Sequence, residues 1–175
     1  MNIIPSNSTH YRNSLIALYK ATFSDGASAQ YIDSRELGGY IGRFCSNGGF
    51  LLAFDNNELA GALLYCPLRS DSLLPDEINQ HFNVEKSLYI AELMVAGPAR
   101  GKGLGTRLLI QFFETARNLE YSHVFIRVWE ENIPALNLYL KMGFVKVGSI
   151  EQAKLRPGGN EAFMMKKIYL HKKIE

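Results

Sequence analysis

Three glycines spaced two residues apart, Gly101, Gly103 and Gly105, form the part of this sequence best suited to binding a ligand. They lie between an apolar run and an amphipathic helical pattern, so we expect a turn that leads from a strand into a helix. The first N–H groups of a helix are unpaired and lie at the positive end of its dipole, which favours phosphate. Glycine lets ligand oxygens approach that backbone, although a tight turn also explains it. The basic residues that could add charge at the rim are Arg100, Lys102 and Arg107.

Two common phosphate-binding loops do not match this segment. The pattern GxxxxGK[ST] fails because three residues separate Gly97 from Gly101, and because Gly103 follows Lys102 where Ser or Thr is required. The dinucleotide pattern GxGxxG fails because the spacing here is GxGxG and the segment follows a predicted antiparallel hairpin. The chain therefore belongs to neither class of nucleotide-binding protein.

The segment Arg100–Gly105 resembles the Q/R-x-x-G-x-G/A signature of the GNAT superfamily of N-acetyltransferases. The run from Asn132 to Phe144 resembles the family ending N-x-x-A-x-x-x-Y-x-x-x-G-F, and the likeness is close over residues 50–144. The resemblance implies an α/β (α+β) fold with a mixed, mostly antiparallel sheet of about seven strands. It also implies that the sheet splays after the fourth strand and carries about four helices on its two faces.

The same resemblance implies that acetyl-CoA is the cosubstrate and that its pantetheine arm enters the splay. The positions expected to bind it are Leu93, Met94, Val95, Arg100, Gly101, Lys102, Gly103, Leu104, Gly105, Thr106, Asn132, Ala135 and Tyr139. Asn132 fits a helix cap before Pro134 equally well. The resemblance also makes Tyr139 the acid that protonates the leaving thiolate. From the residues alone, packing of an aromatic side chain would be the favoured interpretation of Tyr139.

Glu92 is the candidate general base. It interrupts an otherwise apolar strand, where alternation places it on one face with Leu88, Ile90 and Met94. An amine with a pKa of about 10.4 is protonated at pH 7, and freeing its lone pair costs roughly 4 to 5 kcal/mol without a base. Burial raises the pKa of a carboxyl, which suits this role. A structural hydrogen bond or a contact with the acceptor's charge also fits Glu92, and Glu130 is the second candidate base.

The expected reaction is transfer of an acetyl group to a primary amine of a small-molecule or peptide acceptor by direct attack on the thioester. We expect the acceptor where the loop 22–33, the segment 68–82 and the turn 156–160 converge. The acidic residues there that could attract an amine, or equally could be solvated, are Asp25, Asp33 and Glu36. Transfer to a hydroxyl, transfer of another acyl chain, and a non-catalytic acetyl-CoA-binding module are the alternatives. The presence of both Glu92 and Tyr139 argues against the last.

Hydrophobic patterns predict the elements that position these residues. Apolar runs predict strands at residues 3–4, 50–54, 59–66, 88–95, 123–129, 144–150 and 162–170. Helical spacing predicts helices over residues 11–19, 37–44, 104–119 and 134–142, with a short helix near 76–82. The polar residues 55–58 predict a hairpin, and the strand–helix alternation that follows predicts neighbouring parallel strands. No repeat or linker divides residues 1–175, so we expect a single acetyltransferase domain. We expect Trp129 and Phe144 in its core.

Composition limits the possible partners. A net charge of +2 does not favour nucleic acid, and the C-terminal basic residues Lys166, Lys167, Lys172 and Lys173 are interpreted as solvated. Two cysteines 21 residues apart and four scattered histidines predict no metal site. Residues 1–10 lack the pattern of a signal peptide, and no apolar run reaches the ~20 residues that cross a bilayer. We therefore expect a cytoplasmic protein without membrane contact. A homodimer fits this kind of domain.

Overall fold

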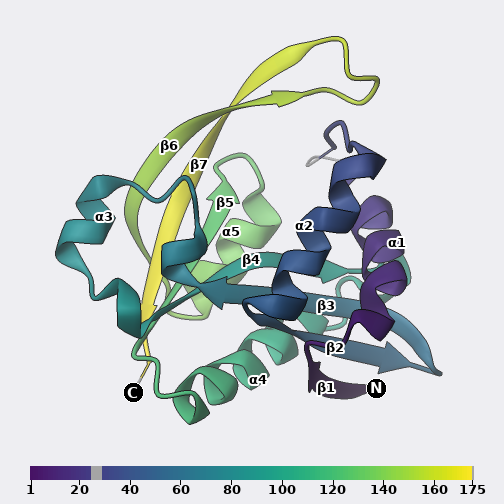
Figure 1. Ribbon diagram of the computed structural model, residues 1–175, viewed down its shortest axis with the longest axis horizontal. Coiled ribbons are helices and arrows are strands. Elements are labelled where there is room, and N and C mark those ends of the chain that lie inside the picture. Colours follow the sequence, from purple (N-terminus) through teal and green to yellow (C-terminus); the bar gives the residue numbers. More distant parts are fainter. Residues whose placement is uncertain (25–28, 175) are drawn as a thin grey trace.

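The structure is a computed structural model that describes residues 1–24 and 29–174. Its strands are β1 (Asn2–Ser6), β2 (Gly49–Asp55), β3 (Glu58–Pro67), β4 (Ser87–Val95), β5 (His123–Trp129), β6 (Val145–Leu155) and β7 (Ala162–Lys173). Its α-helices are α1 (Arg12–Phe23), α2 (Ser34–Ser46), α3 (Asp76–His81), α4 (Leu104–Asn118) and α5 (Ile133–Lys141). The strands form one sheet in the order β1-β2-β3-β4-β5-β7-β6, with α1 and α2 on one face and α4 on the other (Figure 1). The predicted fold class is confirmed.

The hairpin β2–β3 forms at the predicted turn. Asn56 and Asn57 both adopt positive φ, 48° and 67°, between the paired residues Asp55 and Glu58. A two-residue turn with two positive φ angles matches the twist of antiparallel strands, and asparagine tolerates that conformation better than most residues. Local turn chemistry therefore sets the register of this half of the sheet.

Strands β4 and β5 are parallel, and their pairing is short. Residues 87–90 of β4 pair with residues 123–126 of β5. Beyond these residues, β4 continues to pair with β3, and β5 continues to pair with β7. The two strands therefore separate toward the C-terminal ends of both, as the predicted splay after the fourth strand requires.

The hairpin β6–β7 is longer than the apolar pattern predicts. Residues 151–155 continue β6 and pair with residues 162–166, so the hairpin extends beyond the rest of the sheet (Figure 1). This stretch is mixed in polarity and therefore lacks the apolar run used to predict strands. Both β6–β7 and β5–β7 are antiparallel. Among the described strands, the expected parallel neighbours reduce to the one pair β4–β5.

Helix α4 lies close against the sheet because β3 has a glycine beneath it. A Cβ atom at Gly61 would lie 2.9 Å from Cδ2 of Leu104 and 3.0 Å from the carbonyl oxygen of Met94. Leu104 and Leu108 are buried in the core between α4 and the sheet. The first turn of α4, which follows the glycine-rich segment, is thus fixed at the edge of the splay.

This close approach predicts opposite effects for two alanine substitutions. Gly61→Ala should destabilise the fold by about 1 to 3 kcal/mol, because the added methyl group meets backbone in a packed core. Gly39→Ala should stabilise it by about 0.5 to 1 kcal/mol, because Gly39 is exposed within α2 and an added Cβ meets nothing within 4 Å. Chemical denaturation of both variants measures the difference. Equal stability of the two would contradict the packing described for α4.

Candidate active site

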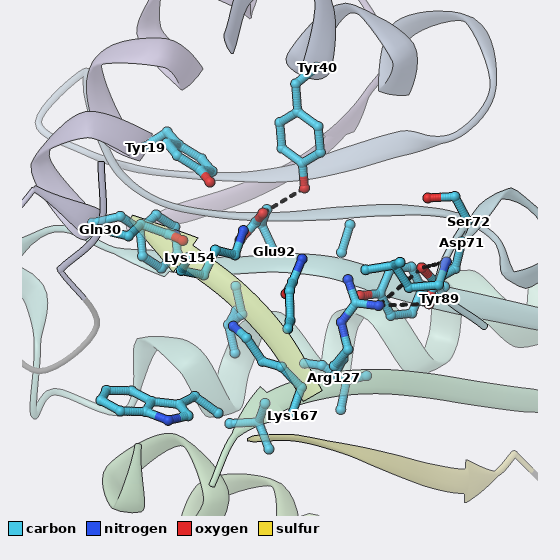
Figure 2. A pocket seen from close by; sticks show the side chains of 18 of the residues that line it. Tyr19, Gln30, Tyr40, Asp71, Ser72, Tyr89, Glu92, Arg127, Lys154 and Lys167 are labelled. Atoms are coloured by element: carbon cyan, nitrogen blue, oxygen red, sulfur yellow. Dashed lines mark hydrogen bonds and ion pairs between the residues drawn. The ribbon is translucent and has the colours of Figure 1, made fainter. Parts of the chain in front are cut away.

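A pocket of about 830 Å³ lies where β4 and β5 separate, beside helices α1, α2 and α5. The predicted site residues that line it are Glu92, Leu93, Asn132, Ala135 and Tyr139. Figure 2 looks into this pocket and shows Glu92 between Tyr40 on one side and Lys154, Lys167 and Arg127 on the other. The splay therefore collects predicted residues from β4 and α5 around one space.

A β-bulge determines which way Glu92 faces. Leu88 and Ile90 lie in the core under α4, whereas Glu92 contacts α2 on the opposite face of the sheet. The register of β4 on β3 shifts between Ile90 and Glu92, which leaves Ala91 as an extra residue and reverses the alternation. The prediction that Glu92 shares a face with Leu88 and Ile90 is therefore wrong. Met94, which follows the bulge, does share its face.

The carboxyl group of Glu92 is desolvated but hydrogen-bonded. The hydroxyl of Tyr40 donates a hydrogen bond of 2.6 Å to its Oε1. Burial raises the pKa of Glu92, and the Tyr40 hydrogen bond opposes this rise. The positive charges of Lys167, Lys154 and Arg127 also oppose it. The net effect is a pKa above that of an exposed glutamate, which a general base working near neutral pH requires.

Tyr139 is buried on α5 and lines the same pocket. Its ring packs edge-on against Phe144, with 6.0 Å between the ring centroids. Burial raises the pKa of its hydroxyl, and the negative charge of Glu92 adds to the rise. The hydroxyl therefore stays protonated at neutral pH. The packing interpretation explains the ring, and a proton donated by the hydroxyl remains a prediction.

The glycine turn has the geometry of an anion site. Gly101 and Gly103 adopt φ of 72° and 74°, in the left-handed region that favours glycine, and a Cβ at either would meet nothing within 4 Å. Gly103 is the N-cap of α4 and provides no side-chain cap. In the described part of the chain, no backbone hydrogen bond outside the helix uses the N–H groups of residues 101–106. N–H groups at the start of a helix fit the pyrophosphate of acetyl-CoA.

The neighbouring predicted residues differ in what they can offer a ligand. Leu93 and Val95 are partly buried on the α4 side, and Leu93 lines the pocket. The side chains of Met94 and Leu104 are buried in opposite cores, so each can present its backbone alone. Gly105 allows α4 to approach α5, because a Cβ there would lie 3.1 Å from a methyl group of Leu138.

The basic residues near the turn are not equivalent. Arg100 is exposed, and its Nε donates to the last carbonyl of β4 at 3.1 Å. Lys102 is exposed at the turn, and Thr106 is partly buried in the first turn of α4. Arg107 instead donates to the carbonyl of Met1 at 3.3 Å. Arg100 and Lys102 therefore remain as the candidate rim charges.

Other predicted residues have mixed outcomes. Asn132 caps α5 by accepting a backbone hydrogen bond at 3.4 Å, and it also lines the pocket. Glu130, the second candidate base, forms an ion pair of 3.2 Å with Lys166 outside the pocket lining. Phe144 is buried as expected. Trp129 is partly exposed and lines the pocket, so its assignment to the core is wrong.

Sequence reasoning missed a buried polar network beside Glu92. Nη1 of Arg127 lies 3.2 Å from Oδ1 of Asp71 and donates to the hydroxyl of Tyr169 at 2.7 Å. That hydroxyl donates to Oδ2 of Asp71 at 2.7 Å. A charged residue within the apolar run 123–129 is the signal that could have identified Arg127, because the same kind of interruption identified Glu92.

Two lysines of the β6–β7 hairpin also line the pocket. Lys154 on β6 and Lys167 on β7 are both partly buried. Burial, and then the charge of Lys154, lower the pKa of Lys167 to about 8, and burial lowers the pKa of Lys154 as well. The interpretation of Lys167 as a solvated residue is therefore wrong. The reason is that β7 is a paired strand at this position, where one face is covered.

The expected acceptor segments contribute unequally. Residues of the loop 22–33 and of the segment 68–82 line the pocket, whereas none of the turn 156–160 does. That turn lies at the hairpin tip, where a Cβ at Gly159 would lie 3.3 Å from the ring of Tyr31. The turn therefore contacts the loop that borders the pocket.

Of the acidic residues expected to attract an amine, Asp25 lies outside the described residues. Asp33 and Glu36 line the pocket. The guanidinium of Arg35 hydrogen-bonds Asp33 at 2.7 Å and lowers the pKa of that carboxyl to about 2. Asp33 thus already has a cationic partner at the surface.

Residues 1–24 and 29–174 contain no group of three or more His, Cys, Asp or Glu side chains placed to hold a metal ion. No helix in that part of the chain is long and apolar enough to cross a membrane. Cys45 and Cys66 are free thiols, and burial raises the pKa of Cys66 to about 11. The Cys66 thiol is therefore protonated at neutral pH and unsuited to act as a nucleophile.

The chain matches the model of the Acetyltransferase (GNAT) family over residues 12–144. This span contains the glycine turn, Glu92 and Tyr139. The chain belongs to the GNAT acetyltransferase family. The predicted family is confirmed, and the match extends it to include α1 and α2, where the sequence resemblance was not close.

Curated relatives carry acetyltransferase names. The chain is 34% identical over 82 residues to an N-acetyltransferase 9-like protein of Nematostella vectensis, a match covering 45% of the chain and 41% of that protein. It is 29% identical over 96 residues to the L-2,4-diaminobutyric acid acetyltransferase of Virgibacillus pantothenticus, covering 49% of the chain and 60% of that enzyme. The matches thus span less than two thirds of either relative.

Solved structures share the GNAT fold over nearly the whole chain. A ribosomal-protein-alanine N-acetyltransferase of Brucella melitensis superposes with a TM-score of 0.75 at 19% identity, covering 99% of each chain. YncA of Salmonella typhimurium, solved with its cofactor acetyl-CoA, superposes with a TM-score of 0.73 at 14% identity, covering 100% of this chain and 95% of that one. At these identities the likeness establishes the fold.

The geometry of the GNAT turn predicts that Gly103→Glu weakens acetyl-CoA binding at least tenfold. The new side chain would carry negative charge into the open space beside the free N–H groups. Gly158→Glu is the matched control, since Gly158 also has positive φ, 102°, and open surroundings but lies at the distant hairpin tip. Calorimetric titration with acetyl-CoA measures both. Unchanged affinity in folded Gly103→Glu would reject the turn as the phosphate site.

Proposed function

We propose that this protein transfers the acetyl group of acetyl-CoA to a primary amine by direct attack of the amine on the thioester. The observation that carries the proposal is the meeting of Glu92 and Tyr139 in one pocket at the strand splay. The glycine turn lies at the start of α4, whose first turn packs beside β4 and α5. Donor-binding and proton-transfer groups therefore border the same region of the molecule. We also propose that residues 1–175 form one domain, since both helical layers pack on a single sheet.

The donor is proposed to bind through the chain's own backbone. Acetyl-CoA, when bound, supplies an activated acyl thioester. The N–H groups of residues 101–106 would bind its pyrophosphate, and Arg100 and Lys102 would add charge at the rim. Leu93 and Ala135 line the pocket from β4 and α5, and they would contact the pantetheine arm between the separated strands. The acetyl-CoA complex of the structurally similar YncA supports this choice of donor.

Glu92 is proposed to accept the proton of the amine. An exposed glutamate has a pKa of about 4.3 and is a weak base at neutral pH. Burial raises the pKa of Glu92, while the Tyr40 hydroxyl holds its carboxylate in place. The resulting group binds a proton more tightly than a solvated carboxylate, which general base catalysis near neutral pH favours.

Tyr139 is proposed to donate a proton to the departing thiolate. A thiol of pKa about 8.5 leaves more readily when a proton is supplied as its bond to carbon breaks. The raised pKa of the Tyr139 hydroxyl ensures that this proton is present at every physiological pH. Glu92 and Tyr139 then act on opposite ends of one transfer, the first removing a proton and the second adding one.

The pH profile should reveal Glu92. Because its pKa is raised, kcat/KM should rise with pH through a limb above pH 4.3, the ordinary value for glutamate. Glu92→Gln should abolish this limb and lower kcat/KM at least tenfold, because the amide cannot accept the proton. Tyr40→Phe should move the limb to higher pH, because the lost hydrogen bond stabilised the carboxylate.

Tyr19→Phe is the matched control for this profile. Tyr19 lines the same pocket but forms no hydrogen bond with Glu92 among the described residues, so its loss should leave the limb in place. The measurement is release of coenzyme A thiol from acetyl-CoA with a panel of amines between pH 5 and 9. A Glu92→Gln enzyme with the wild-type rate and profile would exclude Glu92 as the base.

Tyr139→Phe should lower kcat at least tenfold and leave acetyl-CoA affinity within about twofold of the wild type. Phenylalanine preserves the packing on Phe144 and removes the hydroxyl alone. Tyr121→Phe is the control, since Tyr121 packs against the same core but does not line the pocket. Steady-state kinetics and calorimetry give the two quantities. Near-normal kcat in Tyr139→Phe would reject the acid role and leave the packing role.

A further inference from the structure

The wall of the pocket opposite Tyr40 carries positive charges that the proposed transfer does not use. Arg127, Lys154 and Lys167 come from β5, β6 and β7, and all three line the pocket. Trp129 pairs with Lys167 across β5 and β7, and Arg127 lies two residues before it on the same face. Figure 2 shows the three side chains directed into the space around Glu92. They therefore form a cationic wall on one continuous sheet face.

Among the described residues, neither lysine forms a close ion pair, although the charge of Glu92 raises the pKa of both. Among the described residues, no carboxylate lies within 4.0 Å of the amino group of Lys154 or Lys167. Burial lowers the pKa of both lysines, the charge of Arg127 lowers both further, and the charge of Lys154 also lowers the pKa of Lys167. Partly buried charges are costly unless they are paired, so this arrangement favours a bound anion.

The guanidinium group of Arg127 uses some of its hydrogen-bond donors within the protein and leaves others available to a ligand. Its bonds to Asp71 and Tyr169 all use Nη1. Nη2 and Nε have no hydrogen-bond partner in the part of the chain that the structure describes. The side chain of Asp71 is 4% exposed, and its carboxylate is paired with Arg127 inside the wall. The charges left to act on a ligand are those of the two lysines and the free edge of the guanidinium.

A simple amine is poorly matched to this pocket. Of the described carboxylates that line the pocket, Asp71 is paired with Arg127, whereas the charge of Glu92 acts on the two lysines and is lost when Glu92 accepts a proton. A diamine or polyamine would bring more positive charge toward Lys154 and Lys167. An amine that also carries a carboxylate would place its anion on the lysines and its amino group near Glu92, satisfying both.

Building on the proposed acetyl transfer, we propose that Lys154, Lys167 and the free edge of Arg127 form a carboxylate-binding subsite, and that the acceptor is a small amino acid with the reacting amine on its side chain or α-carbon. The pocket of about 830 Å³, which must also admit the acyl end of the donor, suits an acceptor of this size. The subsite gives the β6–β7 hairpin a direct part in acceptor choice.

Matched pairs of amines that differ by one carboxylate test the subsite. Calorimetric titrations at pH 7 of protein saturated with coenzyme A would compare L-2,4-diaminobutyrate with 1,3-diaminopropane, and L-lysine with cadaverine. At least one carboxylated member should bind tenfold or more tightly than its partner. Lys154→Met and Lys167→Met should each remove most of that preference and leave binding of the diamines unchanged or tighter.

Lys166→Met is the matched control, because Lys166 neighbours Lys167 on β7 but pairs with Glu130 outside the pocket lining. Its binding preference should equal that of the wild type. Equal or weaker binding of every carboxylated amine, or no binding of any, overturns the subsite. A carboxylated amine that binds through the lysines but releases no thiol from acetyl-CoA supports the subsite and contradicts the proposed transfer. The two proposals therefore fail separately.

Discussion

The site depends on one break in the sheet, the end of hydrogen bonding between β4 and β5 after Ile90 and Ile126. A continuous sheet satisfies its backbone groups strand to strand and leaves no room between neighbours. Here each strand keeps its outer partner, so the sheet remains one structure while its centre opens. The bulge at Ala91 follows the last paired residue directly and turns Glu92 toward α2. Opening and side-chain direction thus arise from the same few residues.

Charge balance is the second organising feature, and it links distant elements. Desolvation of Glu92 is opposed by a hydrogen bond from α2 and by cations from β5, β6 and β7. Arg127 pairs with Asp71, but the lysines of the hairpin have no carboxylate within 4.0 Å among the described residues. Such a pocket is tuned for a ligand that carries both signs of charge. The hydrogen bonds that join Arg127, Asp71 and Tyr169 hold the cationic wall in place, and they leave some N–H groups of the Arg127 guanidinium unused.

Local sequence predicted most of the fold and the proposed donor side of the site, but little of the proposed acceptor side. The glycine turn and the run from Asn132 to Phe144 are each an unbroken stretch of sequence. The spacing of residues within each stretch is therefore enough to predict its role. Glu92 could be identified as a charge in an apolar strand, but its direction could not, because one inserted residue reverses alternation and leaves no mark in composition. From the sequence, Lys167 is interpreted as solvated and Lys154 is not singled out, because alternating polar residues near a hairpin fit solvent exposure equally well. What covers a strand face is decided by elements far away in the chain.

The long β6–β7 hairpin has a consequence for how this protein can change over evolutionary time. Its tip reaches the loop before α2, where the N–H of Tyr31 donates to the carbonyl of Leu155 at 2.8 Å. On the proposed assignment, main-chain groups after β4 hold the donor, and the positive φ angles of Gly101 and Gly103 restrict replacement there. The hairpin, by contrast, supplies its part of the pocket through side chains. Substitutions confined to the β6–β7 hairpin can therefore change the acceptor of the enzyme while its proposed acetyl-CoA site stays intact.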